Sequence, residues 1–278
     1  MVWIFNNLSY CLYICYSFRE INKASTVNKA WLSVSRQPAL WECLDSTNGL
    51  TNSDGKKLNM TSFLKLLGRP QFANLKTLSI PYKLKFGKTS CKQISLACPH
   101  LESLDINGIK AKDHDLVEVA ERFTNLTSIS IDMWNVTNYG IRSMAQAMGG
   151  QLLHLDIRGD SITEHYLSDS ALGVIASSCQ NLKSFTYKVS SFYYKKELDG
   201  LSGAGILSLV EGCRNLEVLT LCGASNIGRD TFVTIANQVA QGEAASIGGN
   251  GRYALRRINL RLYPFTVSGY PFRIEDTV

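Results

Sequence analysis

The amino-acid sequence predicts an α/β solenoid in which about seven copies of a strand–helix unit stack side by side. The main evidence is a six-residue apolar pattern, Leu-x-x-Leu-x-Ile or a close variant, that recurs along the chain. Its copies begin at Leu75, Leu101, Leu126, Leu152, Leu182, Leu216 and Leu255. These first leucines are 26, 25, 26, 30, 34 and 39 residues apart, and repeats of roughly 20 to 50 residues are typical of solenoid proteins.

Each copy of the pattern predicts a short strand with one buried face. In Ser103-Leu-Asp-Ile106 the apolar and polar residues alternate, so the two kinds of side chain point to opposite faces. The segments between copies have helical periodicity instead, as in Leu116, Val119, Ala120 and Phe123. Because one strand cannot bury its apolar face alone, neighbouring units must share a core. We expect strands along the concave inner edge and helices on the outside.

Three cysteines stand three residues before a first leucine, in Ala-Cys98-Pro-His-Leu, Ser-Cys179-Gln-Asn-Leu and Gly-Cys213-Arg-Asn-Leu. In this pattern, residues 58–262 resemble the cysteine-containing subclass of leucine-rich repeats, and the resemblance implies a horseshoe-shaped solenoid. We expect the three thiols to be buried at the corner between helix and strand. No Cys-x-x-Cys or Cys/His cluster accompanies them, so we predict no metal site and no cofactor.

Composition favours an intracellular protein. The net charge of +6 is spread over 278 residues without a long basic run, which does not predict nucleic-acid binding. Residues 1–18 are apolar and aromatic, but they lack the basic start and cleavage site of a signal peptide, and Asn6-Asn7 interrupt them. We therefore expect no membrane association. Eight dispersed cysteines predict reduced thiols and a cytoplasmic or nuclear location.

The segment before the repeats has its own pattern. Val27 and Trp31 share a helical face, and Pro38 suits the first turn of a second short helix that carries Leu40, Trp41 and Leu44. Here the chain resembles the second half of an F-box, although the Leu-Pro opening of the first half is absent. We predict a partial F-box-like helical segment at 1–45, a polar linker at 46–57 and a tail at 263–278. The alternative is a two-helix cap over the first repeat.

The F-box resemblance implies a substrate-recognition adaptor of an SCF-type ubiquitin ligase. In that role a Skp-type adaptor, itself linked to a cullin, would contact Val27, Trp31, Pro38, Leu40 and Trp41. The repeats would hold a protein substrate, and outside the complex the chain is expected to be a monomer. No catalytic motif is present, so we predict no enzymatic activity. The alternative is a leucine-rich-repeat interaction scaffold with no role in ubiquitin ligation.

Strand alternation also predicts which residues contact the substrate on the concave face. The candidates are Asp105, Asp132, Trp134, His154, Asp156, Arg158, Lys188, Arg257 and Arg261. Hydroxyl and acidic groups dominate the early repeats and cations begin at Arg158, which suggests a partner with one basic and one acidic end. Large aromatic residues, Trp134 and Phe192-Tyr193-Tyr194, are candidate anchors. Solvated strand positions without a selected partner remain the simpler interpretation for any single residue.

Overall fold

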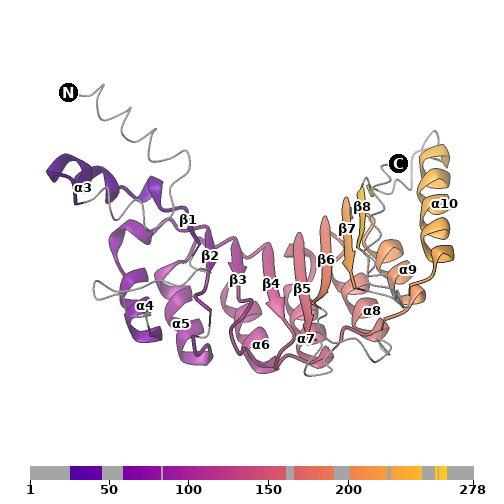
Figure 1. Ribbon diagram of the computed structural model, residues 1–278, viewed down its shortest axis with the longest axis horizontal. Helices are drawn as coiled ribbons and strands as arrows, with labels where there is room; N and C mark the ends of the chain where they lie inside the picture. The colour runs from indigo at the N-terminus through magenta and orange to yellow at the C-terminus, as the bar shows by residue number, and fades with distance from the viewer. Residues whose placement is uncertain are drawn as a thin grey trace, which may run out of the picture. The chain divides into compact units, whose positions relative to one another are not determined.

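The computed structural model describes residues 26–45, 59–82, 84–160, 166–190, 201–223, 227–245, 254–255 and 257–261. In this part of the chain short parallel strands alternate with helices, as the repeat pattern predicts (Figure 1). The chain divides into two compact units, unit 1 (Met1–Ile129) and unit 2 (Ser130–Val278). The predicted tail and the whole of the predicted linker, together with Phe192-Tyr193-Tyr194, lie outside the described residues.

The described part of unit 1 begins with helix α3 and contains three strands that pair in parallel. In chain order its elements are α3 (Lys29–Ser35), η1 (Pro38–Leu40), β1 (Cys43–Asp45), α4 (Met60–Leu67), η2 (Pro70–Phe72), β2 (Thr77–Ser79), α5 (Lys88–Ala97), β3 (Ser103–Asp105) and α6 (Asp113–Arg122). Leu44 pairs with Leu78, which pairs with Leu104. Strand β4 (Ser128–Asp132) begins at the end of this unit.

Unit 2 contains four further strands, which pair in parallel in chain order. Its elements are α7 (Asn138–Met148), η3 (Gly149–Gln151), β5 (His154–Asp160), α8 (Asp169–Ser178), β6 (Ser184–Ser190), α9 (Gly203–Gly212), β7 (Val218–Cys222), α10 (Arg229–Ala245) and β8 (Arg257–Arg261). Helix α8 packs against α7 on one side and α9 on the other (Figure 1).

The repeated leucines form the core of both units. The first leucines of six copies, from Leu75 to Leu216, are at most 1% exposed. The fourth position of each of these copies is equally buried, and the polar residues on either side of it are half-exposed or exposed. Each strand therefore buries one face against its unit's helices and leaves the other accessible. No helix among the described residues is long and apolar enough to span a membrane.

In several copies a cysteine three residues before the first leucine, or an asparagine directly before it, ties consecutive repeats together. Cys98, Cys179 and Cys213 are at most 1% exposed, which confirms their predicted burial. The thiol of Cys213 donates to the carbonyl of Cys179 at 3.3 Å. The side-chain amide of Asn181 likewise donates to the carbonyl of Gly150 at 2.8 Å. Both bonds satisfy carbonyl groups just past the preceding helix, which have no partner within that helix.

One strand comes before the seven copies that the sequence pattern reveals. The predicted second helix of the F-box-like segment is only the single 3₁₀ turn η1, and β1 follows it. The carbonyl of Glu42 accepts the N–H groups of Lys76 and Thr77 at 2.8 and 2.9 Å. One repeat later, the carbonyl of Lys76 accepts two N–H groups in the same way. Residues 41–45 are therefore a further repeat strand, with Trp41 in the place of the first leucine.

Candidate protein-binding face of strands β5 to β8

The register of β5 to β8 arranges their accessible residues in three rows across unit 2. The first row is His154, Ser184, Val218 and Arg257. The second is Asp156, Thr186, Thr220 and Asn259, and the third is Arg158, Lys188, Cys222 and Arg261. Buried residues such as Leu155 and Phe185 separate the rows because side chains alternate along a strand. Six of the nine residues predicted to contact the substrate thus occupy register positions on one sheet face: His154, Asp156, Arg158, Lys188, Arg257 and Arg261.

This face carries more cationic than anionic residues. Arg158 and Lys188 occupy directly opposed positions on β5 and β6, where like charges repel each other. Asp156 partly offsets this repulsion, because its Oδ2 lies 3.7 Å from Nζ of Lys188. Its other oxygen, Oδ1, is buried and has no hydrogen-bond partner among the described residues. His154 and Arg158 are exposed, so the face can offer hydrogen-bond donors to a partner.

The end of the face at β7 and β8 is polar and basic. The side-chain amide of Asn259 donates to the hydroxyl of Thr220 at 3.2 Å, which joins the two strands in the second row. Arg257 is exposed beside Val218 in the first row. Arg261 ends β8 opposite Cys222, and its side chain lies outside the described structure.

The other predicted contact residues help to close turns after their strands. In unit 1, Oδ1 of Asp105 accepts the backbone N–H and the side-chain amide of Asn107 at 2.9 and 2.7 Å. In unit 2, Oδ1 of Asp132 accepts the backbone N–H of Trp134 at 3.2 Å. Both are turns of the kind that aspartate makes with a backbone two residues on. Trp134 is 39% exposed and keeps the accessibility expected of an anchor.

The F-box-like residues have different environments. Val27 is 65% exposed, Pro38 is exposed and Leu40 is half-buried. Trp41 is only 2% exposed: its indole N–H donates to the carbonyl of Ser35 at 2.6 Å, and its ring meets Phe72 edge-on at 5.0 Å. Trp41 therefore packs inside unit 1 and is not accessible to an adaptor. The side chain of Trp31 lies outside the described structure.

The structure contains a charged cluster that the sequence pattern did not reveal. Glu118 of α6 has an 11% exposed side chain and lies 2.8 Å from Nζ of Lys88 and 2.6 Å from Nε of Arg122. Hydrogen bonds from Lys88 and then Arg122 lower the pKa of Glu118. The only sequence signal was the four-residue spacing of Glu118 and Arg122. Because Lys88 belongs to α5, the cluster joins two neighbouring helices, which is a structural role.

The described residues do not form a metal site. Within the described ranges no group of three His, Cys, Asp or Glu residues is arranged to hold an ion. His154 and Asp156 share the accessible face of β5. The basic group paired with Asp156 there is Lys188, at 3.7 Å.

The chain was compared with known proteins. No protein-family model matches it, and no curated protein matches it. One similar solved structure is described as "Crystal structure of Rad7 and Elc1 complex in yeast". The match has 16% sequence identity and a TM-score of 0.34, and it covers 84% of this chain and 65% of the other. The chain thus spans slightly less than two thirds of the length of that relative.

Proposed function

We propose that this chain recognises a protein partner through the accessible face of β5 to β8. The observation that supports the proposal most is the third row, in which Arg158 and Lys188 lie side by side and, among the described side chains, Asp156 is the carboxylate paired with them. Apposed cations favour a partner that presents carboxylates or other acceptors, because complementary charge fixes register and speeds association. The chain would contribute recognition and proximity rather than catalysis.

We propose further that the partner is a substrate delivered to an SCF-type ubiquitin ligase, with a Skp-type adaptor bound by residues 26–40. The support is the F-box resemblance of Val27, Trp31, Pro38 and Leu40, together with the position of α3 and η1 directly before the first repeat strand. The cullin would join through the adaptor, in the cytoplasm or the nucleus. Of these residues, Val27 and Pro38 are accessible.

A pull-down of the full chain with purified Skp-type adaptor tests this role. The variant is Val27→Glu, which places a charge on a side chain that is 65% exposed. The matched control is Val233→Glu on α10, where the side chain is 50% exposed. We expect the first variant to lose adaptor binding and the second to retain it. The role would be refuted if the wild-type chain did not bind the adaptor, or if the two variants bound it equally well.

An interaction scaffold unrelated to ubiquitin is the second candidate. It is favoured by the burial of Trp41, because packing against Phe72 and the hydrogen bond to Ser35 explain why tryptophan stands at this position without any adaptor. If the wild-type chain is folded but binds no Skp-type adaptor, the scaffold function would be supported, and the strand face would still be the site of recognition.

A further inference from the structure

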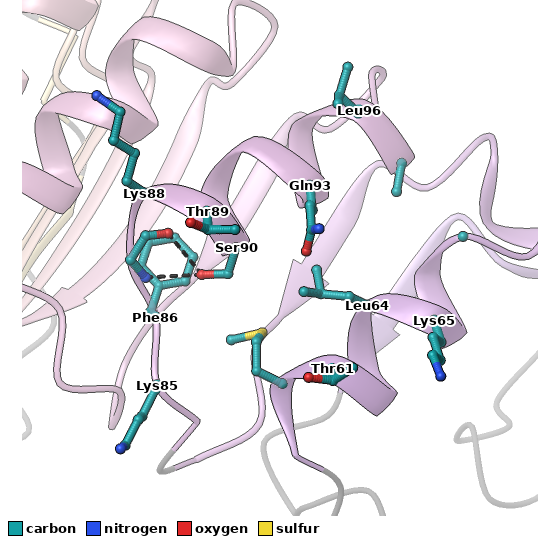
Figure 2. A pocket seen from close by; sticks show the side chains of 14 residues that line it. Thr61, Leu64, Lys65, Lys85, Phe86, Lys88, Thr89, Ser90, Gln93 and Leu96 are labelled. Carbon is teal, nitrogen blue, oxygen red and sulfur yellow. Dashed lines mark hydrogen bonds between the residues drawn. The ribbon is translucent and has the colours of Figure 1, made fainter.

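A groove separates helices α4 and α5 in unit 1 (Figure 2). Its volume is about 1030 Å³. Helix α4, helix α5 and the loop before α5 all line it. Its lining residues include Leu64, Lys65, Gly68, Lys85, Lys88 and Leu96. Figure 2 shows Leu64 of α4 and Gln93 of α5 pointing toward each other across the space between the helices.

The groove exposes apolar surface that the described residues of unit 1 do not cover. Leu96 is 72% exposed, the highest value for any large apolar side chain among the described residues. Leu64 is half-buried, while Phe63, Leu66 and Leu67 of the same helix are buried in the core. Helix α4 therefore places apolar side chains both in the core and at the groove.

The charges around this apolar surface all have one sign. Three of its fourteen lining residues are Lys65, Lys85 and Lys88, and none is acidic. Lys88 is ion-paired with Glu118 but has a 73% exposed side chain. Lys65 and Lys85 make no ion pair within the described part of the chain, and they lie at the outer edge of the groove (Figure 2). Apolar surface with a cationic rim complements an apolar stripe flanked by carboxylates.

We propose that this groove binds an amphipathic helix of a partner protein, with leucine-type residues facing Leu64 and Leu96 and acidic residues facing the lysines. Helix-in-groove docking places apolar residues at positions i, i+3 or i+4, and i+7 of the bound segment. The site belongs to a different unit from the strand face and goes beyond the proposed function, because it would engage a second partner, or a second segment of the same one. It does not depend on adaptor binding.

The first experiment pans a displayed library of 16-residue peptides against the full-length chain, with the Leu96→Glu variant as the counter-selection. We expect enriched peptides to carry leucine-type residues at helical spacing and Asp or Glu between them. The proposal would be overturned if the enriched peptides were basic, or if no enriched peptide required Leu96 for binding.

The second experiment measures the Kd of one enriched peptide by fluorescence anisotropy. Leu96→Glu should weaken binding at least about tenfold, as for a central interface residue. Gly68→Trp should do the same by filling the groove, since Gly68 has a φ of −70° and an added Cβ would meet only Leu64 and Lys65 carbonyl oxygens at 3.6 and 3.9 Å. Reversing Lys65 and Lys85 to Glu should weaken binding by about fivefold and reduce its salt dependence.

Matched controls separate these effects from unfolding. Gly173→Trp on α8 adds the same side chain where nothing lies within 4 Å of the new Cβ. Val233→Glu adds the same charge at another exposed apolar residue. Both should change the Kd by less than about twofold, as surface substitutions away from an interface do. All variants should keep the urea midpoint of the wild-type chain. Equal loss of binding in the controls would contradict a site at the groove.

Two other partners of a basic apolar surface are outcomes of the same experiment. Vesicles of phosphatidylcholine and phosphatidylserine, or a single-stranded oligonucleotide, could compete with the peptide. Competition that is lost with Leu96→Glu would identify a lipid surface or a nucleic acid as the ligand and would overturn the peptide proposal. We expect neither to compete.

Discussion

Trp41 connects the segment before the repeats to the repeat core. It takes the position that leucine has in the later copies, and its larger ring reaches Phe72 at 5.0 Å while its N–H holds the carbonyl at the end of α3. A leucine could fill part of this space but could not donate that hydrogen bond. The residue type is therefore explained by contacts on both of its sides.

We predict that Trp41→Ala lowers the free energy of unfolding by about 3–5 kcal/mol, because it leaves a large cavity in the core. Trp41→Phe should cost only about 1–3 kcal/mol, the penalty for leaving the buried carbonyl of Ser35 unpaired. Urea unfolding followed by circular dichroism measures both values. Equal stability of the alanine variant and the wild-type chain would contradict the observed packing.

The buried thiols make stability sensitive to alkaline pH. Burial raises the pKa of Cys91, Cys98 and Cys213 from 9.0 to about 12, and that of Cys179 to about 11. Below pH 9 both the folded and the unfolded chain keep these protons, so the thiols contribute no pH dependence. Above pH 9 the unfolded chain releases protons that the folded chain retains, and stability must fall.

We predict that the free energy of unfolding decreases between pH 9 and about pH 11–12, by up to about 1.4 kcal/mol per pH unit for each thiol. Urea unfolding at a series of pH values measures the slope. Cys98→Ala should make the slope shallower, since that thiol is removed, whereas Cys43→Ala changes an exposed residue and should have less effect. An unchanged slope in the Cys98 variant would exclude thiol titration as the cause.

At the scale of elements, the pairing of β5 with β6 brings together charges that are 30 residues apart in the sequence. The parallel register sets Arg158 beside Lys188 without regard to their charge, because the leucines of the two copies determine the alignment. The Asp156–Lys188 pair is solvent-accessible and contributes little to stability. Changes to these residues should therefore affect binding more than folding.

We predict that the double variant Arg158→Glu with Lys188→Glu loses the proteins that the wild-type chain captures through its strand face. The measurement is quantitative mass spectrometry of cross-linked partners, together with a urea midpoint for each variant. Lys183→Glu is the control, since Lys183 is exposed just before β6 and lies outside the three rows. The same set of partners for the double variant and the control would rule out recognition by this face.

The elements that sequence analysis predicted well are those with a periodic pattern. The seven apolar copies become β2 to β8, and the segment whose helical periodicity includes Leu116, Val119 and Ala120 is α6 (Asp113–Arg122). Strand β1 was missed because Trp41 and Ser46 replace the usual leucine and isoleucine. The rows of polar residues followed from strand alternation. The groove beside Leu96 could not be predicted, because it depends on the spacing of two helices in space rather than on residue types.

At the scale of the whole molecule, the first strand determines where the chain can be shortened. Strand β1 pairs with β2, and the carbonyl of Glu42 satisfies two N–H groups of the next repeat. Removing β1 would expose the edge of β2 and the apolar side chains of Phe72 and Leu78, which are completely buried. Exposed edges of this kind promote association between chains, and terminal repeats of a solenoid need a cover.

We predict that a chain of residues 37–278 stays monomeric, whereas residues 46–278 self-associate and unfold at lower urea concentration. The first deletion removes α3 but keeps Trp41 and β1, and it should cost about 1–2 kcal/mol through the lost bond to Ser35. Size-exclusion chromatography with light scattering measures the association. Identical behaviour of the two fragments would mean that β1 does not cover the edge of β2.

This comparison also decides how a loss of adaptor binding must be interpreted. A fragment without residues 1–45 lacks the F-box-like residues and the first repeat strand at once, so its failure to bind an adaptor could result from a disrupted unit 1. Residues 37–278 lack Val27 and Trp31 but retain the core contacts of Trp41. If this fragment is folded and binds no adaptor while the full chain does, the contact lies in residues 1–36. If both bind equally, Val27 and Trp31 are not needed for adaptor binding, and the contact must come from Pro38 and Leu40 or from the repeats.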